Sequence, residues 1–175
     1  MPLVWRIVPL HHADTPFDGE GARLHGGRWN SVGMPAVYCA SSIALGVLEI
    51  LVHLDTGRPT PEFAAIPLEL DPRHIEPMPL LSALPRDWAH ASAPESTRRL
   101  GDAWLSRNDR LAFTLPSVLV PRENNYLINP LHRDLSMQIQ RTVEPHELVR
   151  LDRRLLPLPT GKATYSMPRP RKSAD

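Results

Sequence analysis

AVYCASSIALGVLEILVHL, residues 36–54, is the stretch of the sequence that indicates most clearly how the chain folds. Its first five residues are of types that favour strands, and they predict a short strand with Tyr38 in the middle. Ser41 and Ser42 are good helix caps, so a helix should follow and run to about Leu54. Apolar residues occupy almost every side of that helix, which predicts that it is buried.

One acidic residue, Glu49, interrupts this apolar helix. A buried carboxylate destabilises a fold by several kcal/mol unless it is paired or protonated. His53 lies one turn further along and would be its nearest neighbour within the helix. Arg6 and Arg28 are alternative partners, in which case Glu49 would form a structural ion pair. Glu49 is therefore the residue of this stretch that most needs an explanation.

The segments on either side predict short strands, loops and one more helix. Before residue 36, LVWRIV (residues 3–8) predicts a strand that carries Arg6. A predicted loop, residues 11–22, then leads into LHGGRWN, residues 24–30. After residue 54 we expect strands at 63–70, 111–121 and 148–156, a helix at 96–107, and a turn-rich loop at 124–132. The mixture predicts an α+β fold.

Length and composition predict one folded domain with a tail. The 175 residues, 42% of them hydrophobic, are enough for a single core, which we assign to residues 1–156. Residues 157–175, PLPTGKATYSMPRPRKSAD, have little apolar periodicity and a basic end. We expect this proline-rich segment to be a flexible tail.

Charge and cysteine content exclude several classes of protein. The net charge of +1 gives no global field that would attract nucleic acid or an anionic membrane. Cys39 is the only cysteine, so no internal disulfide can form, and no secretory signal is recognisable. The longest apolar run, residues 43–54, is far short of the ~18 residues of a membrane span. A cytoplasmic location is expected, with neither a membrane nor a nucleic acid as direct partner.

Arg6, Arg28, Tyr38 and Glu49 combine two guanidinium groups, a phenol and a carboxylate in the first third of the chain. Arginine binds phosphate oxygens as a bidentate fork, and a glycine such as Gly27 lets backbone N–H groups approach the same anion. This combination suits a pyrophosphate. An aromatic ring can stack on a flat base, and a buried carboxylate can accept hydrogen bonds from ribose hydroxyls. A carboxylate beside the ribose would also stabilise the positive charge that develops when a glycosidic bond breaks.

Structural interpretations of the same residues remain open. The two glycines of GGRWN could form an ordinary turn, and Trp29 and Tyr38 could be core residues. Ser117, in the middle of LPSVLV, could be a small buried residue bonded to backbone. His25, His53 and His132 lack the spacing of metal ligands, so no metal site is expected. The sequence also lacks a phosphate-binding P-loop, a GxSxG elbow and a GxGxxG motif before a helix.

Four ordered blocks of the sequence resemble the RES-domain family, the toxins of bacterial toxin–antitoxin pairs named for an arginine, a glutamate and a serine. The blocks are GARLHGGRWNSVGMPAVYCASSIALGVLEILVHL, LPRDW, GDAWL and LPSVLVPRENNYLINPLH. The resemblance extends from Trp5 to about His132, which is roughly three quarters of the chain. It implies a compact α+β fold similar to that of ADP-ribosylating toxins.

The resemblance also implies an activity and the residues that carry it. By position, Arg28, Glu49 and Ser117 match the three naming residues, Tyr38 matches the tyrosine of the family, and Arg6 matches a further arginine. The catalytic residues would be Arg28, Tyr38, Glu49 and Ser117. NAD would be the substrate, bound by these residues together with Arg6, Gly27 and Asn30. The expected partner is an antitoxin with an Xre-like helix-turn-helix region.

The acceptor of the ADP-ribose stays open at this point. Cleavage of the nicotinamide–ribose bond could transfer it to water or phosphate, and a specific cellular protein is the alternative acceptor. A toxin that binds nucleic acid is a more remote possibility, supported only by the basic tail sequence PRPRK. A purely structural partner of the antitoxin is a third.

Overall fold

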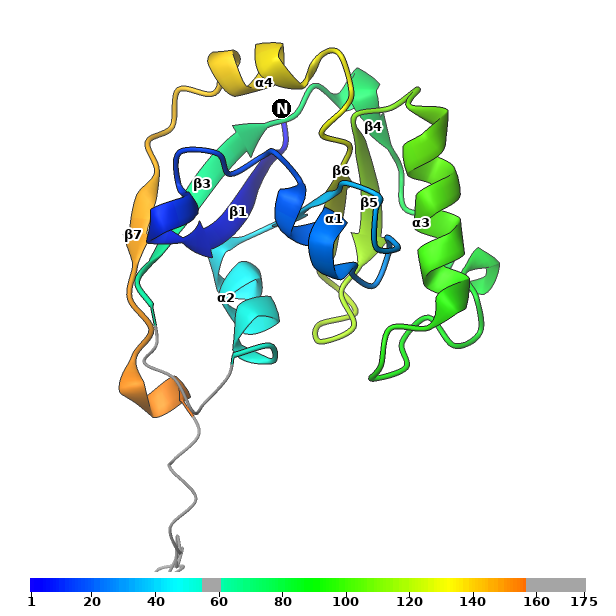
Figure 1. Cartoon of the computed structure of the whole chain (residues 1–175), viewed down its shortest axis with the longest axis horizontal. Coiled ribbons are helices and arrows are strands. Elements are labelled where there is room, and N and C mark those ends of the chain that lie inside the picture. The colour runs from blue at the N-terminus through cyan, green and yellow to red at the C-terminus, as the bar shows by residue number, and fades with distance from the viewer. Residues whose placement is uncertain (55–60, 157–175) are drawn as a thin grey trace, which may run out of the picture.

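The computed structural model describes residues 1–54 and 61–156 and contains one mixed sheet with helices packed around it (Figure 1). The expected tail, residues 157–175, lies outside the described residues. The strand order is β4-β5-β6-β2-β1-β3-β7. The strands are β1 (Leu3–Pro9), β2 (Val37–Ala40), β3 (Phe63–Glu69), β4 (Ile75–Glu76), β5 (Ala112–Pro116), β6 (Asn124–Ile128) and β7 (Glu147–Val149). The helices are α1 (Glu20–His25), α2 (Ile43–Leu51), α3 (Glu95–Arg107) and α4 (Leu135–Arg141).

The middle of the sheet is antiparallel. β1 pairs with β3 along its whole length, from Leu3 opposite Glu69 to Pro9 opposite Phe63. β6 lies between β2 and β5 and pairs antiparallel with both. Among the strands of the described residues, only the short β4 is parallel to its neighbour, β5. This arrangement confirms the α+β prediction, whereas the assignment of residues 1–156 to one catalytic domain stays a prediction.

Of the three apolar clusters in the described residues, one packs α2 against β1 and β3, and the other two join the sheet to α4 and to α3. The α4 cluster joins strand residues such as Val4, Leu68 and Ile128 to Leu135 of α4. The α3 cluster joins Trp29, in the loop after α1, to α3 and β5. Within it, the rings of Trp104 and Phe113 stack at a centroid distance of 5.4 Å. α3 therefore stands beside β5 in Figure 1, with the GGRWN segment packed between helix and sheet.

Several predicted elements are confirmed, with small shifts at their ends. The first strand, the strand around Tyr38, the strand beginning at Phe63 and the helix that carries Trp104 are all present. The expected strand at residues 148–156 is only partly present, because β7 ends at Val149 and a 3₁₀ helix covers Arg153–Leu155. α1 begins at Glu20, inside a segment that was predicted to be a loop, and α4 was not predicted.

The prediction that the helix after Ser42 is buried is wrong. The helix does begin there, and the Ser42 side chain accepts the N–H of Leu45 at 3.1 Å. However, only Leu45 and Gly46 are buried in α2, while Leu48 is 43% exposed. The reason is that α2 packs against β1 and β2 on one side and lines an open cleft on another. Glu49 is consequently half-buried.

Two predictions about residues 111–132 also need correction. Asn124–Ile128 was predicted to be part of a turn-rich loop and instead forms β6, in the interior of the sheet. Pairing with strands on both sides outweighs the turn preference of the two asparagines. Ser117 was expected near the centre of a strand, but β5 ends at Pro116. Ser117 therefore begins the turn that leads from β5 to β6.

None of the helices in residues 1–54 and 61–156 is both long enough and apolar enough to cross a bilayer.

Candidate active site

A cleft of about 1410 Å³ lies between α2, the sheet and the GGRWN loop. Five of the predicted site residues line it: Arg6, Gly27, Arg28, Tyr38 and Glu49. Arg6 comes from β1 and Tyr38 from β2. Gly27 and Arg28 come from the loop after α1, and Glu49 comes from α2. The fold thus brings Arg6 and Glu49, which are 43 positions apart in the sequence, to the same cleft. The two remaining predicted residues, Asn30 and Ser117, are fully buried and do not line the cleft.

Glu49 is held by two neutral side chains. The hydroxyl of Ser117 donates a hydrogen bond to Glu49 Oε1 at 2.8 Å, and Nδ2 of Asn125 donates to the same oxygen at 2.6 Å. Within the described part of the chain, neither Arg6 nor Arg28 forms an ion pair with Glu49, and His53 does not hydrogen-bond to it. The Glu49 carboxyl group thus has no arginine ion-pair partner among the described residues and has a fixed orientation in the cleft.

Ser117 owes its position to the turn after β5. Its hydroxyl oxygen accepts the backbone N–H groups of Leu119 and Val120, each at 3.1 Å. This is the common use of serine in turns, where the side chain replaces a backbone acceptor. With its lone pairs occupied in this way, the hydroxyl directs its hydrogen to Glu49. The Ser117 hydroxyl therefore holds Glu49 Oε1 in place, while its predicted catalytic role stays a prediction.

Arg28 connects the GGRWN loop to a second loop. Its Nη1 donates to the carbonyl oxygens of Trp88 and His90, both at 2.9 Å, and its Nη2 to that of Ala91 at 3.4 Å. Burial lowers the pKa of Arg28, and the negative charge of Glu49 acts in the opposite direction. The guanidinium group and the carboxylate thus influence each other across the cleft without direct contact.

Arg6 places a second positive charge in the cleft floor. Its Nε donates to Pro16 O at 3.3 Å and its Nη1 to Tyr38 O at 3.2 Å. Burial lowers the pKa of Arg6, and the negative charge of Asp18 partly offsets this effect. Among the described residues no carboxylate forms an ion pair with Arg6. A partly buried, unneutralised cation of this kind favours an anionic ligand.

Tyr38 lines the cleft, and its hydroxyl contacts the GGRWN loop. The hydroxyl accepts the backbone N–H of Trp29 at 2.9 Å and donates to Asn30 Oδ1 at 2.7 Å. Burial raises the pKa of Tyr38, so the phenol stays protonated at neutral pH. Gly27 lies directly against this hydroxyl, since a Cβ at position 27 would be 2.5 Å from it. The phenol therefore fixes the shape of the loop.

Asn30 has a structural task in the same loop. Its amide Nδ2 donates to the carbonyl oxygens of Ala22 and Met34, each at 2.9 Å, while its Oδ1 accepts from Tyr38. The side chain is fully buried and satisfied within the protein. Asn30 thus supports the GGRWN loop and does not line the cleft, whereas Gly27 and Arg28 do.

Sequence reasoning missed Asn125. The segment that contains it was predicted to be a loop, so its side chain had no defined direction. In β6, Asn125 lies opposite Ala40 of β2 and Leu115 of β5, which points its amide towards α2 and Glu49. A signal was present in the sequence, because an asparagine pair directly before the apolar YLI is unusual for an interior strand.

The RES domain model matches residues 3–152 of the chain. The chain belongs to the RES family. Among relatives, it is 38% identical over 133 residues to a Yersinia enterocolitica protein named Toxin Res, with 75% of this chain and 86% of that protein covered. It is 32% identical over 137 residues to the Toxin Res of Photorhabdus laumondii, covering 78% and 87% of the two chains.

A further RES relative carries a more specific name. A Sphingobium protein named Prs ADP-ribosylating toxin is 36% identical over 135 residues, which cover 74% of this chain and 83% of the relative. Among solved structures, a chain of the M. tuberculosis MbcT–MbcA toxin–antitoxin complex superposes with a TM-score of 0.58 and 16% identity. The superposition covers 85% of this chain and 81% of that one, and it establishes the shared fold.

Proposed function

We propose that this RES protein is the toxin of a toxin–antitoxin system and an enzyme that cleaves NAD at the nicotinamide–ribose bond. The observation that carries the proposal is Glu49, a carboxylate oriented by Ser117 and Asn125 in a cleft that also contains two arginines without a carboxylate ion pair among the described residues. Relatives named as toxins, one of them as an ADP-ribosylating toxin, support the assignment.

The charges of the cleft match the charges of NAD. Arg6 and Arg28 would bind the pyrophosphate, and Gly27 would line the site beside Arg28. The ring of Tyr38 would pack against the nicotinamide. Glu49 would then lie at the ribose, where its negative charge stabilises the oxocarbenium-like state that forms as nicotinamide departs.

Each group in this mechanism has one role. Nicotinamide leaves with the electron pair of the glycosidic bond, and an acceptor oxygen forms the new bond to the ribose and releases any proton that it carries to solvent water. Tyr38 stays protonated and so does not act as the base. Ser117 and Asn125 keep Glu49 in place. NAD is consumed as the substrate, and the site needs no metal for this chemistry.

Water or phosphate is the acceptor that we propose first, since either needs only a small opening beside the ribose. A protein acceptor is the second candidate, because a relative of similar length bears the name ADP-ribosylating toxin. We further propose a cytoplasmic location and a partner antitoxin with an Xre-like helix-turn-helix region. A structural relative from a toxin–antitoxin complex is consistent with such a partner.

The purified chain, freed of antitoxin, should be incubated with NAD, with and without phosphate and with a bacterial lysate, and the products identified by mass. ADP-ribose, a phosphorylated ADP-ribose and a modified protein distinguish the three acceptors. Glu49→Gln keeps the size of the side chain and removes its charge, so NAD consumption should fall by about 100-fold or more. Glu20→Gln is the matched control, because Glu20 is exposed and pairs only with Arg23 among the described residues.

Two results would overturn the proposal. One is a purified chain that neither consumes NAD nor labels any lysate protein with ADP-ribose. The other is a folded Glu49→Gln variant that consumes NAD as fast as the unchanged chain.

A further inference from the structure

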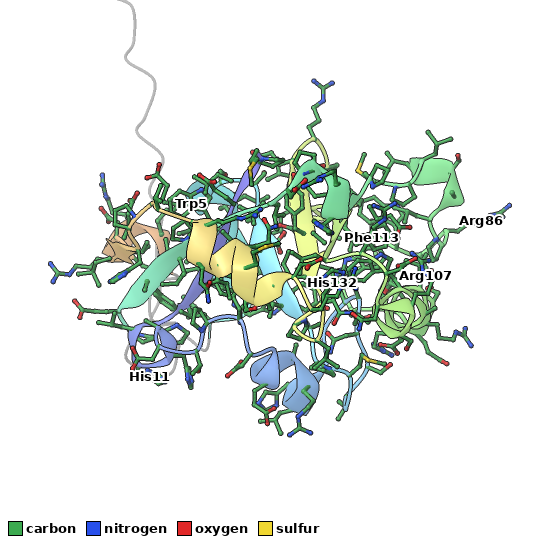
Figure 2. All side chains as sticks on the ribbon, turned by 90° about the horizontal axis from the view of Figure 1, so that it is seen from above. Trp5, His11, Arg86, Arg107, Phe113 and His132 are labelled. Carbon is green, nitrogen blue, oxygen red and sulfur yellow. The ribbon has the colours of Figure 1, made fainter. Side chains whose placement is uncertain are left out.

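A second cluster of polar side chains, His74, His132 and Asp134, lies near the start of α4. None of the three lines the cleft. His74 ends the 3₁₀ helix Pro72–His74 before β4, His132 follows β6, and Asp134 directly precedes α4. One potential ligand atom from each residue lies within 4.8 Å of the other two. Figure 2 shows His132 beside one end of α4.

The distances are close to those of a metal site. Asp134 Oδ2 lies 3.6 Å from His74 Nδ1 and 3.9 Å from His132 Nδ1. Ligands bound to one zinc ion at ~2.1 Å in a tetrahedron are roughly 3.4 Å apart. The carboxylate would therefore have to move by about half an ångström or less towards each ring, and the two ring nitrogens, which lie within 4.8 Å of each other, would have to approach as well. The imidazole rings are already edge to face, with centroids 5.7 Å apart.

The backbone around these residues is fixed before any ion binds. The backbone N–H of His74 donates to Asp71 O at 2.9 Å, and its backbone carbonyl accepts from Leu111 N at 3.0 Å. The backbone N–H of His132 donates to Asn129 O at 3.2 Å, and its backbone carbonyl accepts from Leu135 N at 3.1 Å. Because the backbone is already ordered, ion binding would lose less conformational entropy.

The polarity of the cluster is also that of a cation site. His132 is buried and His74 half-buried, with a carboxylate between them. Among the described residues, the arginine that pairs with this carboxylate is Arg133, whose Nε is 3.9 Å from Asp134 Oδ2 but whose side chain is 91% exposed. Since an exposed pair of this kind is weak, Arg133 leaves the charge of Asp134 available. Two imidazoles and one carboxylate are ligands typical of zinc and its neighbours and not of magnesium or calcium.

We propose that His74, His132 and Asp134 bind one divalent transition-metal ion of the zinc type, with water completing the coordination. The ion would exchange the 3.2 Å hydrogen bond from the Asp134 N–H to His132 Nδ1 for a coordination bond. It would link the turn before β4, the loop after β6 and the start of α4. No metal site was expected from the sequence, because the histidines lack the spacing of metal ligands along the chain. His74, His132 and Asp134 come together only in the fold, since they belong to separate segments.

The test is titration of the full, metal-free chain with Zn²⁺, followed by calorimetry and by thermal unfolding. We expect one ion per chain and a midpoint of unfolding that rises with Zn²⁺ concentration, because an ion that binds only the folded state stabilises it. Co²⁺ should give the visible absorption of a four-coordinate ion. His74→Gln and Asp134→Asn should each weaken Zn²⁺ binding by about tenfold or more, since each removes one of three protein ligands.

The control variant is His11→Gln combined with His12→Gln, because these adjacent exposed histidines are the competing surface site. Zn²⁺ affinity should survive in it. Affinity that is lost in this variant, or that is unchanged in folded His74→Gln and Asp134→Asn, would overturn the proposal. So would the absence of any stoichiometric binding. NAD consumption should be the same with and without a chelator, since the cluster lies outside the cleft, and this separates a failure of the metal proposal from a failure of the proposed enzyme function.

Discussion

At the scale of single residues, the site depends on where hydrogens point. Both donors to Glu49 reach the same oxygen, Oε1, and each comes from a group whose own position is fixed by backbone contacts. A carboxylate that accepts two hydrogen bonds in one direction cannot rotate freely. Its orientation towards the cleft is therefore a property of the folded chain before any ligand binds.

Asn125→Ala tests this orientation. Loss of one hydrogen bond to a charged group typically weakens an interaction by about 1.5–3 kcal/mol, which corresponds to roughly 10- to 100-fold in rate. We expect kcat for NAD consumption to fall by this factor, with little change in KM, since the arginines that would bind the pyrophosphate remain. Asn124→Ala is the matched control, because the adjacent strand residue points to the other face and its side chain has no hydrogen-bond partner among the described residues. An equal loss of kcat in both variants would contradict the positioning role.

Gly27→Ala tests the contact between the GGRWN loop and Tyr38. A methyl group there would lie 2.5 Å from the phenol oxygen and 2.7 Å from Asn30 Oδ1, so the loop or the ring must move. Overpacking of this kind destabilises a fold by roughly 1–3 kcal/mol. Denaturant unfolding should show this loss, and NAD binding should weaken with it.

Gly21→Ala is the control for that loss of stability. A Cβ at position 21 would meet nothing within 4 Å, and the residue lies in α1. This variant should be as stable as the unchanged chain or more stable by up to about 1 kcal/mol. A Gly27→Ala chain with normal stability and activity would contradict the close contact between Gly27 and the Tyr38 hydroxyl.

At the scale of elements, the sequence predicted the groups of the site better than their surroundings. Arg6, Arg28, Tyr38 and Glu49 could be singled out because their types and local patterns are visible in the chain itself. The environment of Glu49 could not, because an apolar helix is expected to be buried on all sides. α2 keeps one side open because a cleft lies there, and a cleft is a property of several elements together.

Strand β6 shows the other limit of local patterns. Its asparagines have turn preferences, and only the pairing with β2 and β5 makes them part of a strand. Because β6 was not expected, neither was the contact between Asn125 and Glu49. In the same way, Ser117 was singled out by family resemblance, but its role as donor to Glu49 depends on the turn after Pro116.

Gly101→Ala tests whether α3 supports the site at a distance. A Cβ at position 101 would overlap the carbonyl oxygen of Trp29, and the neighbouring Asp102 accepts the N–H of Ser31 at 2.8 Å. α3 thus holds the backbone that follows Arg28. The substitution should destabilise the chain by roughly 1–3 kcal/mol or more, since backbone yields less readily than a side chain, and NAD affinity should fall because Arg28 shifts.

Ser106→Ala is the matched control in the same helix, because Ser106 is exposed. Alanine is the better helix former, so this variant should keep or slightly raise the free energy of unfolding. Unfolding curves and NAD titrations of the two variants would decide the point. If Gly101→Ala behaved like Ser106→Ala in both measurements, α3 would not support the loop.

At the scale of the whole molecule, the sheet separates two regions of different chemistry. The cleft with Arg6, Arg28 and Glu49 lies between the sheet, α2 and the GGRWN loop, while the histidine cluster lies at the α4 edge. Strand β2 passes between its neighbours β6 and β1 in the interior of the sheet and carries the only cysteine of the chain. The state of that thiol therefore reports on the whole fold.

Cys39 should react with thiol reagents only when the protein opens. The side chain is 3% exposed, and burial raises the pKa of its thiol to about 12, an effect that the charge of Arg6 only partly opposes. At pH 8 the folded chain thus presents neither access nor thiolate. We expect labelling by a disulfide reagent to be slow and limited by unfolding, and immediate in guanidinium chloride. A bound ligand should slow it further, because binding lowers the unfolded population.

The same thiol gives the folded state a pH dependence of known sign. In the unfolded chain the thiol has an ordinary pKa of 9.0, whereas in the folded chain the value is about 12. The folded state therefore holds this proton more tightly. The stability that it contributes is fully present below pH 9 and is lost as the pH rises towards 12. Cys39→Ala, measured by denaturant unfolding across this range, should show a weaker decline than the unchanged chain. Rapid labelling of the folded chain at pH 8, or an identical decline in both chains, would mean that β2 is more open to solvent than its place inside the sheet implies.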